Sequence, residues 1–242
     1  MGIHIHTVVF DETRSAPALI APPGGTAAAV RQALGVAPPR GAVALVGGAG
    51  GLDTPAYTDV RARLVPLLDV LARLCSRERV AIVDGGTPYG VMRLLGEARH
   101  RLGGALTLIG VGPLGMVTWP GRPAGEGGDT PLDPNHSHFV LVEGEGWGAE
   151  SQMLAGLAYE LGGADHVLEI VINGGEVTRH DVSLYRQGGG PLLVIEGTGR
   201  LADELAAASR AGTPGVGLHL FPLGGAAEDF EALLRRLLNL RG

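Results

Sequence analysis

The sequence contains no lysine, and all 19 of its basic residues are arginines. A chain without lysine cannot form a Schiff base between a lysine amine and a carbonyl substrate. It also has no P-loop lysine to bind a nucleotide phosphate. Any anion must instead be bound by arginine side chains, by backbone N–H groups or by the N-termini of helices.

Cysteine is almost absent as well, since Cys75 is the single one. One cysteine forms no intramolecular disulfide, which is typical of a reducing compartment, so we expect a cytoplasmic protein. Cys75 falls in a helical pattern and is expected to be a small buried apolar residue, not a nucleophile. No apolar run approaches the about 18 residues of a membrane span, and the histidine-containing N-terminus does not fit a signal peptide.

Basic residues are also outnumbered, because 25 acids against 19 bases give a net charge of −6. This excess argues against broad contact with a phosphate backbone, so nucleic acid is not an expected partner. The 242 residues, 45% of them hydrophobic, are enough for one large domain or two small ones with a full core. The 41 glycines are too many for a helical bundle and indicate many tight loops.

Short apolar, β-branched runs alternate with amphipathic helical stretches along the chain. This alternation is typical of a mostly parallel sheet covered on both faces, so we predict one doubly wound α/β domain over residues 1–242. A long helix over residues 55–76 is expected to be kinked or divided at Pro66. Residues 113–135, rich in glycine and proline, are predicted to form a loop.

Four predicted strands end in glycine-rich turns: VGGAGG (46–51), DGGTPYG (84–90), NGGEVT (173–178) and EGTGR (196–200). Ligands of open α/β sheets bind outside the carboxyl ends of the strands. Glycine there lets backbone N–H groups approach a phosphate, although a tight turn alone also favours glycine. None of the turns gives a dinucleotide fingerprint or a Walker motif, which excludes the common NAD-dehydrogenase and P-loop architectures.

The stretch LDPNHSHFVLVEGEGWGAE (132–150) brings two histidines and several carboxylates together and raises three possibilities: a metal site, an acid–base site or a scaffold. His136 and His138 stand two residues apart at the start of a predicted strand, where their side chains point to opposite faces. This spacing disfavours a metal ion, and no metal or separate cofactor is expected. Asp84, which ends its own strand, is interpreted either as a turn-capping residue or as a ribose-binding residue.

Five strings, LVGGAGG, IVDGGTPYGVMRLLGEA, LDPNHSHFVLVEGEGWGAE, VINGGEVT and PLLVIEGTGRLADELA, together resemble the N-terminal cytosolic region of melastatin-type TRP channels. That region belongs to the SLOG superfamily, which has small prokaryotic members without a channel. The resemblance covers roughly residues 42–208. It implies a Rossmann-like fold, a ligand derived from a nucleotide, such as ADP-ribose, and self-association into a homo-oligomer.

The resemblance also implies which residues surround the ligand. Trp147 falls where the channels have a tyrosine near the nucleotide, and an indole there can stack on a base. Asn135, His136 and the residues after them then form a motif at the start of a strand, held by its own loop. The candidate ligand-binding residues, with the second glycine turn included, are Gly47, Gly48, Ala49, Gly50, Gly85, Gly86, Thr87, Trp147, Glu150, Asn173, Gly174, Gly175, Thr178, Gly197, Thr198, Gly199 and Arg200.

A second resemblance concerns catalysis. The "lonely guy" phosphoribohydrolases of the same superfamily carry PGGxGTxxE, and this chain has NGGEVTRHD at 173–181. Asp181 stands at the place of the catalytic glutamate of those enzymes, and Arg200 is the candidate for their arginine. Two functions therefore stay open: a nucleotide-binding sensor, or a hydrolase that cleaves an N-glycosidic or phosphate bond with Asp181 and Arg200. A third is an assembly protein with a vestigial pocket.

Overall fold

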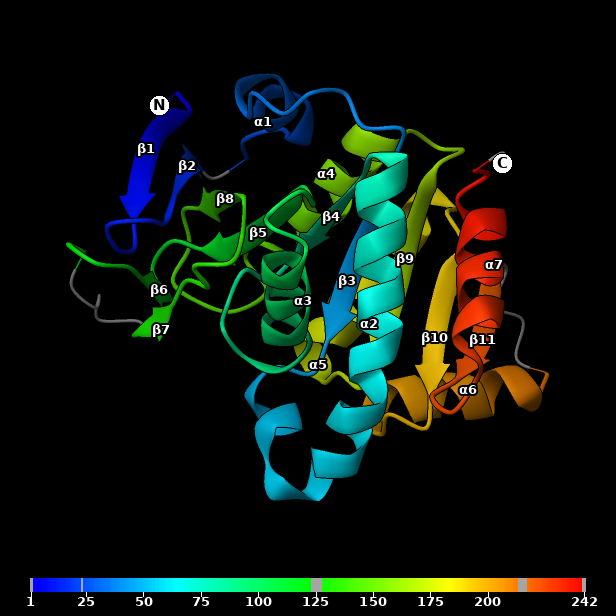
Figure 1. The fold of residues 1–242 in the computed structure, drawn as a ribbon. Coiled ribbons are helices and arrows are strands. Elements are labelled where there is room, and N and C mark those ends of the chain that lie inside the picture. Colours follow the sequence, from blue (N-terminus) through cyan, green and yellow to red (C-terminus); the bar gives the residue numbers. More distant parts are fainter. Residues whose placement is uncertain (1, 23, 123–127, 213–216, 241–242) are drawn as a thin grey trace.

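The computed structural model describes residues 2–22, 24–122, 128–212 and 217–240. Most strands join one nine-stranded sheet in the order β1-β2-β8-β5-β4-β3-β9-β10-β11 (Figure 1). The strands of this sheet are β1 (His4–Val9), β2 (Ser15–Ala21), β3 (Gly41–Gly47), β4 (Val80–Asp84), β5 (Leu108–Pro113), β8 (His138–Val142), β9 (Val167–Ile172), β10 (Leu192–Glu196) and β11 (Leu218–Pro222). The helices are α1 (Ala27–Ala33), α2 (Thr58–Glu78), α3 (Gly90–Arg101), α4 (Ser151–Gly162), α5 (Glu176–Tyr185), α6 (Arg200–Arg210) and α7 (Ala227–Leu237).

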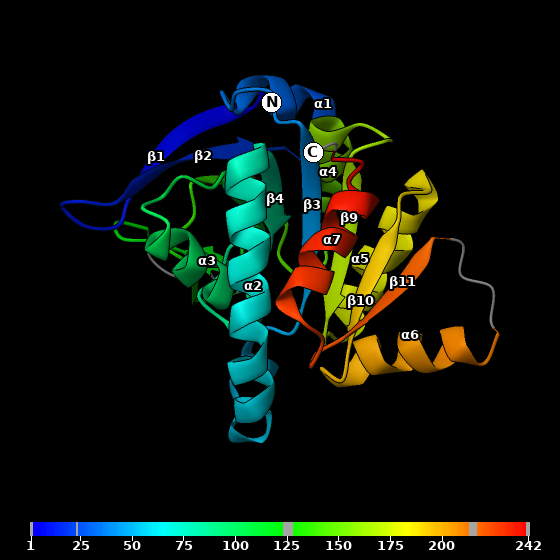
Figure 2. The same ribbon diagram turned by 45° about the vertical axis from the view of Figure 1, so that its right-hand side comes forward.

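The sheet is parallel except at one edge, where β1 pairs with β2 in the antiparallel sense. Its central strands consist of apolar residues that are buried on both faces, which is the pattern that a parallel sheet requires. On β3, Val43 and Leu45 pack with α2, α3 and α7, whereas Ala42, Ala44 and Val46 pack with α1, α4 and α5. Figures 1 and 2 show α2 and α7 crossing the near face. The chain is thus a doubly wound α/β domain with a Rossmann-like fold, as the strand–helix alternation predicts.

Of the two outcomes predicted at Pro66, a kink or a division, the division does not occur, since α2 continues for 21 residues from Thr58 to Glu78. A proline in a helix removes one backbone hydrogen bond. Here, buried Leu64 and Leu67 anchor the helix to the core on both sides of the proline. Tertiary packing therefore outweighs the local preference of proline.

The predicted loop over 113–135 contains a small second sheet, formed by β6 (Val117–Thr118) and β7 (Thr130–Pro131). Residues 123–127 lie outside the described part of the chain. Val117 and Leu132 pack with Phe139 of β8 in a third apolar cluster, which fixes this segment beside the main sheet. The packing brings Thr130 to the carboxyl edge of the sheet.

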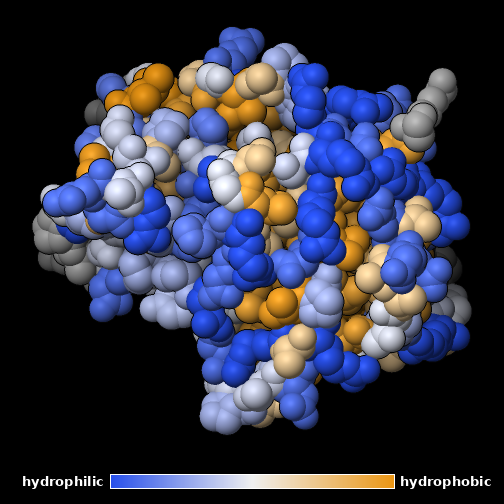
Figure 3. Space-filling model, viewed as in Figure 1, coloured by the Kyte–Doolittle hydropathy of each residue, from blue (hydrophilic) through white to orange (hydrophobic). Residues whose placement is uncertain are grey.

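The exposed surface of α2 is hydrophilic and partly covers the apolar residues on either side of it, as Figure 3 shows. Figure 3 is viewed as Figure 1, so this polar strip runs over the near face of the sheet. No helix in the described part of the chain is long and apolar enough to cross a membrane.

Candidate functional site

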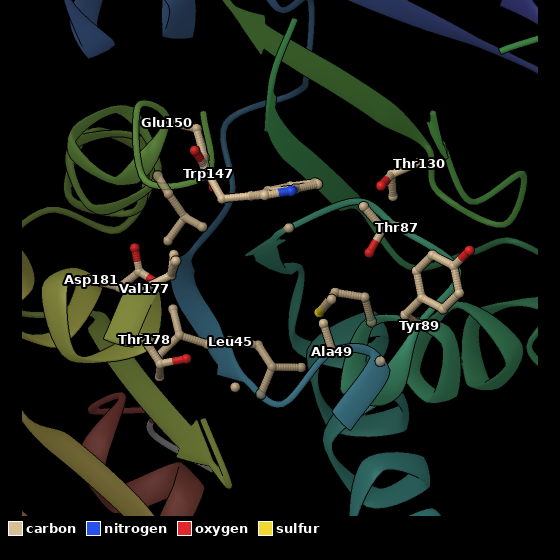
Figure 4. A pocket seen from close by; sticks show the side chains of 16 residues that line it. Leu45, Ala49, Thr87, Tyr89, Thr130, Trp147, Glu150, Val177, Thr178 and Asp181 are labelled. Carbon is tan, nitrogen blue, oxygen red and sulfur yellow. The ribbon is translucent and has the colours of Figure 1, made fainter. Parts of the chain in front are cut away.

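A cavity of about 430 Å³ opens at the carboxyl edge of the sheet, beyond the end of β3. β3 lies between β4 and β9, and the chain continues to opposite sides of it, so the cavity occupies the position where doubly wound sheets bind ligands. Its volume is in the usual range for small-molecule sites. The residues that line it are Leu45, Val46, Gly47, Ala49, Gly50, Gly85, Thr87, Tyr89, Met92, Thr130, Trp147, Glu150, Leu154, Val177, Thr178 and Asp181 (Figure 4).

The first glycine turn uses glycine mainly to bring other parts of the backbone close. A Cβ on Gly47 would lie 2.2 Å from the carbonyl oxygen of Ile172. Gly90, at φ +52°, begins α3 so close to Gly48 that a Cβ would lie 1.9 Å from the Gly48 carbonyl oxygen. In contrast, a Cβ on Gly50 would meet nothing within 4 Å, so this residue leaves space at the cavity wall.

The second glycine turn is held by three buried side chains, which we call the histidine cluster: His136, Asp84 and Asp133. Asp84 Oδ1 accepts a hydrogen bond from the N–H of Gly86 and lies 2.8 Å from His136 Nε2. Asp133 Oδ2 lies 3.2 Å from His136 Nδ1 on the other side of the ring. Burial disfavours the imidazolium, but Asp84 and then Asp133 raise the pKa of His136 to about 9. A protonated His136 therefore balances two buried carboxylates. Asp84 does not line the cavity, and its hydrogen bond to Gly86 is that of a turn-capping residue.

A second group of buried acids lies on the other side of β3, and we call it the acid cluster: Glu150, Asp181 and Glu169. Burial, and then repulsion from Asp181, raise the pKa of Glu150 to about 7, although Gly148 donates its N–H to Glu150 Oε2 at 2.8 Å. Burial raises the pKa of Asp181 to about 6. Glu169 on β9 is fully buried, both of its carboxyl oxygens lack a hydrogen-bond partner, and burial raises its pKa well above the usual range.

Large apolar side chains are exposed at the cavity. The five most exposed in the described part of the chain include Trp147, Tyr89 and Val177, which are 40%, 39% and 38% exposed, and all three line the cavity. In Figure 4 the indole of Trp147 extends across the cavity, with Glu150 and Asp181 on one side and Tyr89 on the other. Exposed aromatic rings around a hollow are typical of a site that is covered by a ligand.

Arg200 lies just beyond the cavity wall, at the start of α6. Its backbone adopts the left-handed region at φ +54°, which a non-glycine residue seldom does. Its guanidinium lies against the third glycine turn, because a Cβ on Gly175 would be 2.4 Å from Arg200 Nη2, and it is also near Gly51 of the first turn. Arg179 nearby forms an ion pair with Glu204, whereas no carboxylate of the described residues pairs with Arg200. Arg200 therefore stands as a free cation between two glycine turns and the N-terminus of α5.

In the fourth glycine turn, backbone N–H groups are already bonded to a side chain of the helix that follows. Asp203 of α6 accepts hydrogen bonds from the N–H groups of Gly197 and Gly199, at 2.6 and 3.1 Å. The buried Thr198 hydroxyl accepts from the N–H of Asn173 at 2.8 Å, and the Asn173 side-chain amide donates to the Thr198 carbonyl. These groups join the third and fourth turns to each other and do not face the cavity.

The structure divides the residues proposed from the sequence into two sets. Those that line the cavity are Gly47, Ala49, Gly50, Gly85, Thr87, Trp147, Glu150, Thr178 and Asp181. Those that lie outside its wall are Gly48, Gly86, Asn173, Gly174, Gly175, Gly197, Thr198, Gly199 and Arg200.

Sequence reasoning missed several lining residues. Tyr89 belongs to the second glycine turn, so the argument that selected Gly85, Gly86 and Thr87 could also have selected it. Leu154 was within reach too, because it lies one helical turn after Glu150. Thr130 was not, since its place depends on the packing of the segment around β6 and β7. In the described part of the chain, no group of three His, Cys, Asp or Glu side chains is arranged to hold a metal ion.

Comparison with solved structures supports the fold. The molybdenum cofactor carrier protein from Chlamydomonas reinhardtii superposes with a TM-score of 0.53 at 16% identity, covering 83% of this chain and 99% of that one. The X-ray structure of the protein TM1055 superposes with a TM-score of 0.51 at 17% identity, covering 81% and 99%. At these identities the likeness shows a shared fold alone.

Comparison of sequences identifies the family. The mouse protein "transient receptor potential cation channel subfamily M member 2" is 30% identical in an alignment 161 positions long that covers 52% of this chain and 11% of the channel. The rat protein of the same name matches to the same extent. This chain therefore corresponds to about a tenth of the length of these relatives. The family model described as "SLOG in TRPM, prokaryote" matches residues 40–228, and the protein belongs to this prokaryotic SLOG family.

Proposed function

We propose that the protein is a sensor that binds a nucleotide-derived small molecule, such as ADP-ribose, in the cavity beyond β3. The observation that carries this proposal is the cavity itself, with Trp147, Tyr89 and Val177 exposed around it. A base stacked on Trp147 would remove apolar surface from water, and stacking of a base on an aromatic side chain contributes about 1–3 kcal/mol.

The ligand's phosphates belong at the rim of the cavity in this proposal. Thr178 and Val177 lie in the first turn of α5, where the helix dipole favours an anion. Arg200 adds a guanidinium without a carboxylate partner among the described residues, and its side chain lies against Gly175 at the start of the same helix. A phosphate between Arg200 and the N-terminus of α5 would receive both charge-assisted and backbone hydrogen bonds.

A hydrolase is the second candidate function, because one observation favours it. Glu150, with a pKa of about 7, is poised to hold or release a proton near neutral pH, as a general acid or base must. Asp181 faces the same cavity and stands at the place of the catalytic acid in the phosphoribohydrolase motif. In this function Glu150 and Asp181 would act on a glycosidic bond of the ligand bound under Trp147.

One experiment separates the two functions. The protein is incubated with ADP-ribose, NAD and nucleoside monophosphates, products are followed by chromatography, and binding is measured by calorimetry. Binding without product supports the sensor and contradicts the hydrolase. Product formation that Asp181→Asn abolishes contradicts the pure sensor. If no compound binds or reacts, the proposed ligand class is wrong.

Self-association and a cytoplasmic location also remain our proposals. The first rests on the family resemblance. The second rests on the single cysteine, since Cys75 is buried in α2. Light scattering after gel filtration tests the first, and localisation of a tagged protein tests the second.

A further inference from the structure

The charges on the cavity wall are all of one sign. Among the described residues that line the cavity, Glu150 and Asp181 are the charged ones, and no arginine or histidine is present. Arg200 stands outside this wall, beside Gly175. The cavity therefore has an acidic interior and a basic residue at its rim.

The acids in and behind the cavity have few partners in the protein, since Glu150 accepts a single hydrogen bond, from the N–H of Gly148. Asp181 is only 7% exposed, and no hydrogen bond joins its carboxylate to a described residue. The hydroxyl of Ser151 lies near enough to favour its ionised form, but it does not meet the geometry of a hydrogen bond. Glu169, behind Asp181, has two unpartnered oxygens and is fully buried. Because a buried and unpaired carboxylate is costly, this arrangement points to a group that the protein itself does not supply.

The missing group has a definable shape and chemistry. Trp147 offers the face of a large aromatic ring, which attracts a cation as well as a flat heterocycle. In Figure 4 the two carboxylates stand on one side of the indole, while Thr87 and Thr130 stand on the opposite side. A flat ring below the indole would thus meet carboxylates at one edge and hydroxyl groups at the other.

We propose that the inner part of the cavity binds a positively charged, flat nitrogen heterocycle, stacked on Trp147 with its charge against Asp181 and Glu150. This inference deepens the proposed function and rests on it. The heterocycle is the base of the nucleotide-derived ligand, and the phosphates lie outside, toward Arg200. A neutral base such as adenine would leave the acids without a counter-charge.

The cavity acids also make the affinity for a cation depend on pH. Glu150 and Asp181 repel each other, and Asp181 also repels Glu169. His180 favours the ionised form of Asp181. Since burial raises the pKa of both cavity acids, part of each is protonated near neutral pH. A cation binds better to the ionised acids, so its affinity should rise from about pH 5 to about pH 8, and binding should release protons.

The test uses pairs of ligands that differ in the charge of one ring. Affinities are measured by calorimetry for NAD⁺ against NADH and for 1-methylnicotinamide against nicotinamide. ADP-ribose, whose single base is the neutral adenine, serves as the reference without a cationic ring. We expect each cation to bind at least about tenfold more tightly than its neutral counterpart at about pH 8, and less so at about pH 5.

Variants of the cavity acids test whether these acids cause the preference for a cationic ring. Asp181→Asn should remove most of the preference for the cation, with Glu150→Gln as a second variant and Asp59→Asn, an exposed acid on α2, as the matched control. Equal affinities of the cationic and neutral members, with ADP-ribose still bound, would overturn this inference and leave the proposed function intact. Failure of ADP-ribose and of both pairs to bind would overturn the proposed function as well.

Discussion

The two groups of buried acids on either side of β3 differ in whether they contain a cation. The histidine cluster contains its own cation, because His136 lies between Asp84 and Asp133. The acid cluster contains none: Glu169 has no hydrogen-bond partner among the described residues, and Asp181 has only the Ser151 hydroxyl near it. Both clusters are buried and lie close to the same cavity.

The difference separates structure from function. Buried acids whose charge is balanced by a cation of the same protein stabilise one backbone conformation. Here they hold the turn that places Gly85 and Thr87 at the cavity wall. Buried acids without a balancing cation destabilise the ligand-free protein, and proteins retain such groups mainly at binding sites and catalytic sites. The histidine cluster is thus interpreted as a positioning device and the acid cluster as the part of the site that meets the ligand.

The largest expected effect comes from breaking the complete cluster. His136→Asn would leave Asp84 and Asp133 buried without the imidazolium that lies between them, which should lower the free energy of unfolding by about 3–5 kcal/mol. Urea denaturation at neutral pH measures this. His138→Asn is the control, because His138 is only partly buried and its ring nitrogen bonds to Ser137. A loss below about 1 kcal/mol for His136→Asn would contradict the role of the cluster.

The same cluster predicts a pH window for wild-type stability. The pKa of His136 is raised from its usual 6.5 to about 9 in the folded protein. Its stabilisation is therefore fully present below about pH 6.5 and is lost as the pH rises through about 9.

Arg200→Ala should give the next largest effect. If Arg200 contacts a phosphate, the change should weaken binding of ADP-ribose by about 1.5–3 kcal/mol and leave a nucleoside without phosphate unaffected. Calorimetry with both ligands checks this. Arg73→Ala is the matched control, since Arg73 is an exposed arginine on α2 without a cavity contact. Equal losses for nucleoside and ADP-ribose would show that Arg200 acts on the shape of the site and not on a phosphate.

Trp147→Ala tests the stacking surface. Loss of the indole should weaken binding of every ligand that carries a ring by about 1–3 kcal/mol. Trp119→Ala provides the control, because Trp119 lies against Arg122 and does not line the cavity. Unchanged affinity in the Trp147 variant would place the ligand elsewhere.

Asp181→Asn should change the stability less than His136→Asn does, and in the opposite direction. The raised pKa means that ionising Asp181 opposes folding, a penalty that is absent below about pH 4 and complete above about pH 6. The variant should therefore be more stable than wild type by at most about 3 kcal/mol at about pH 8 and equal to it at about pH 4. Glu160→Gln, an exposed acid on α4, is the control in thermal unfolding. Destabilisation at high pH would show that Asp181 has a partner after all.

The sequence predicted the fold and the edge of the sheet that carries the cavity, because both depend on local patterns. Apolar strands such as VALV in β3 require two buried faces, and glycine turns after parallel strands meet at one edge. The partners inside those turns depend on contacts that no local pattern shows. Asp84 and His136 are 52 positions apart. Asp203 fills the turn that its own helix follows, although the same glycines suggested a phosphate site.

The acid cluster was visible only in part from the sequence for a similar reason. Glu150 and Asp181 were singled out there, but as catalytic or binding candidates and without their shared lack of a cation. Glu169 was not, since it stands within an apolar strand whose burial depends on α4 and α5 packing over it. Charge balance in a buried site is a property of the assembled fold.

The most direct test of the acid cluster is a carbon NMR titration of Glu150 and Asp181, in the free protein and with a cationic ligand bound. The structure predicts pKa values of about 7 for Glu150 and about 6 for Asp181 in the free protein, both falling when the cation binds. Ordinary carboxyl pKa values in the free protein, or values that saturating ligand leaves unchanged, would contradict the assignment of these acids to the ligand.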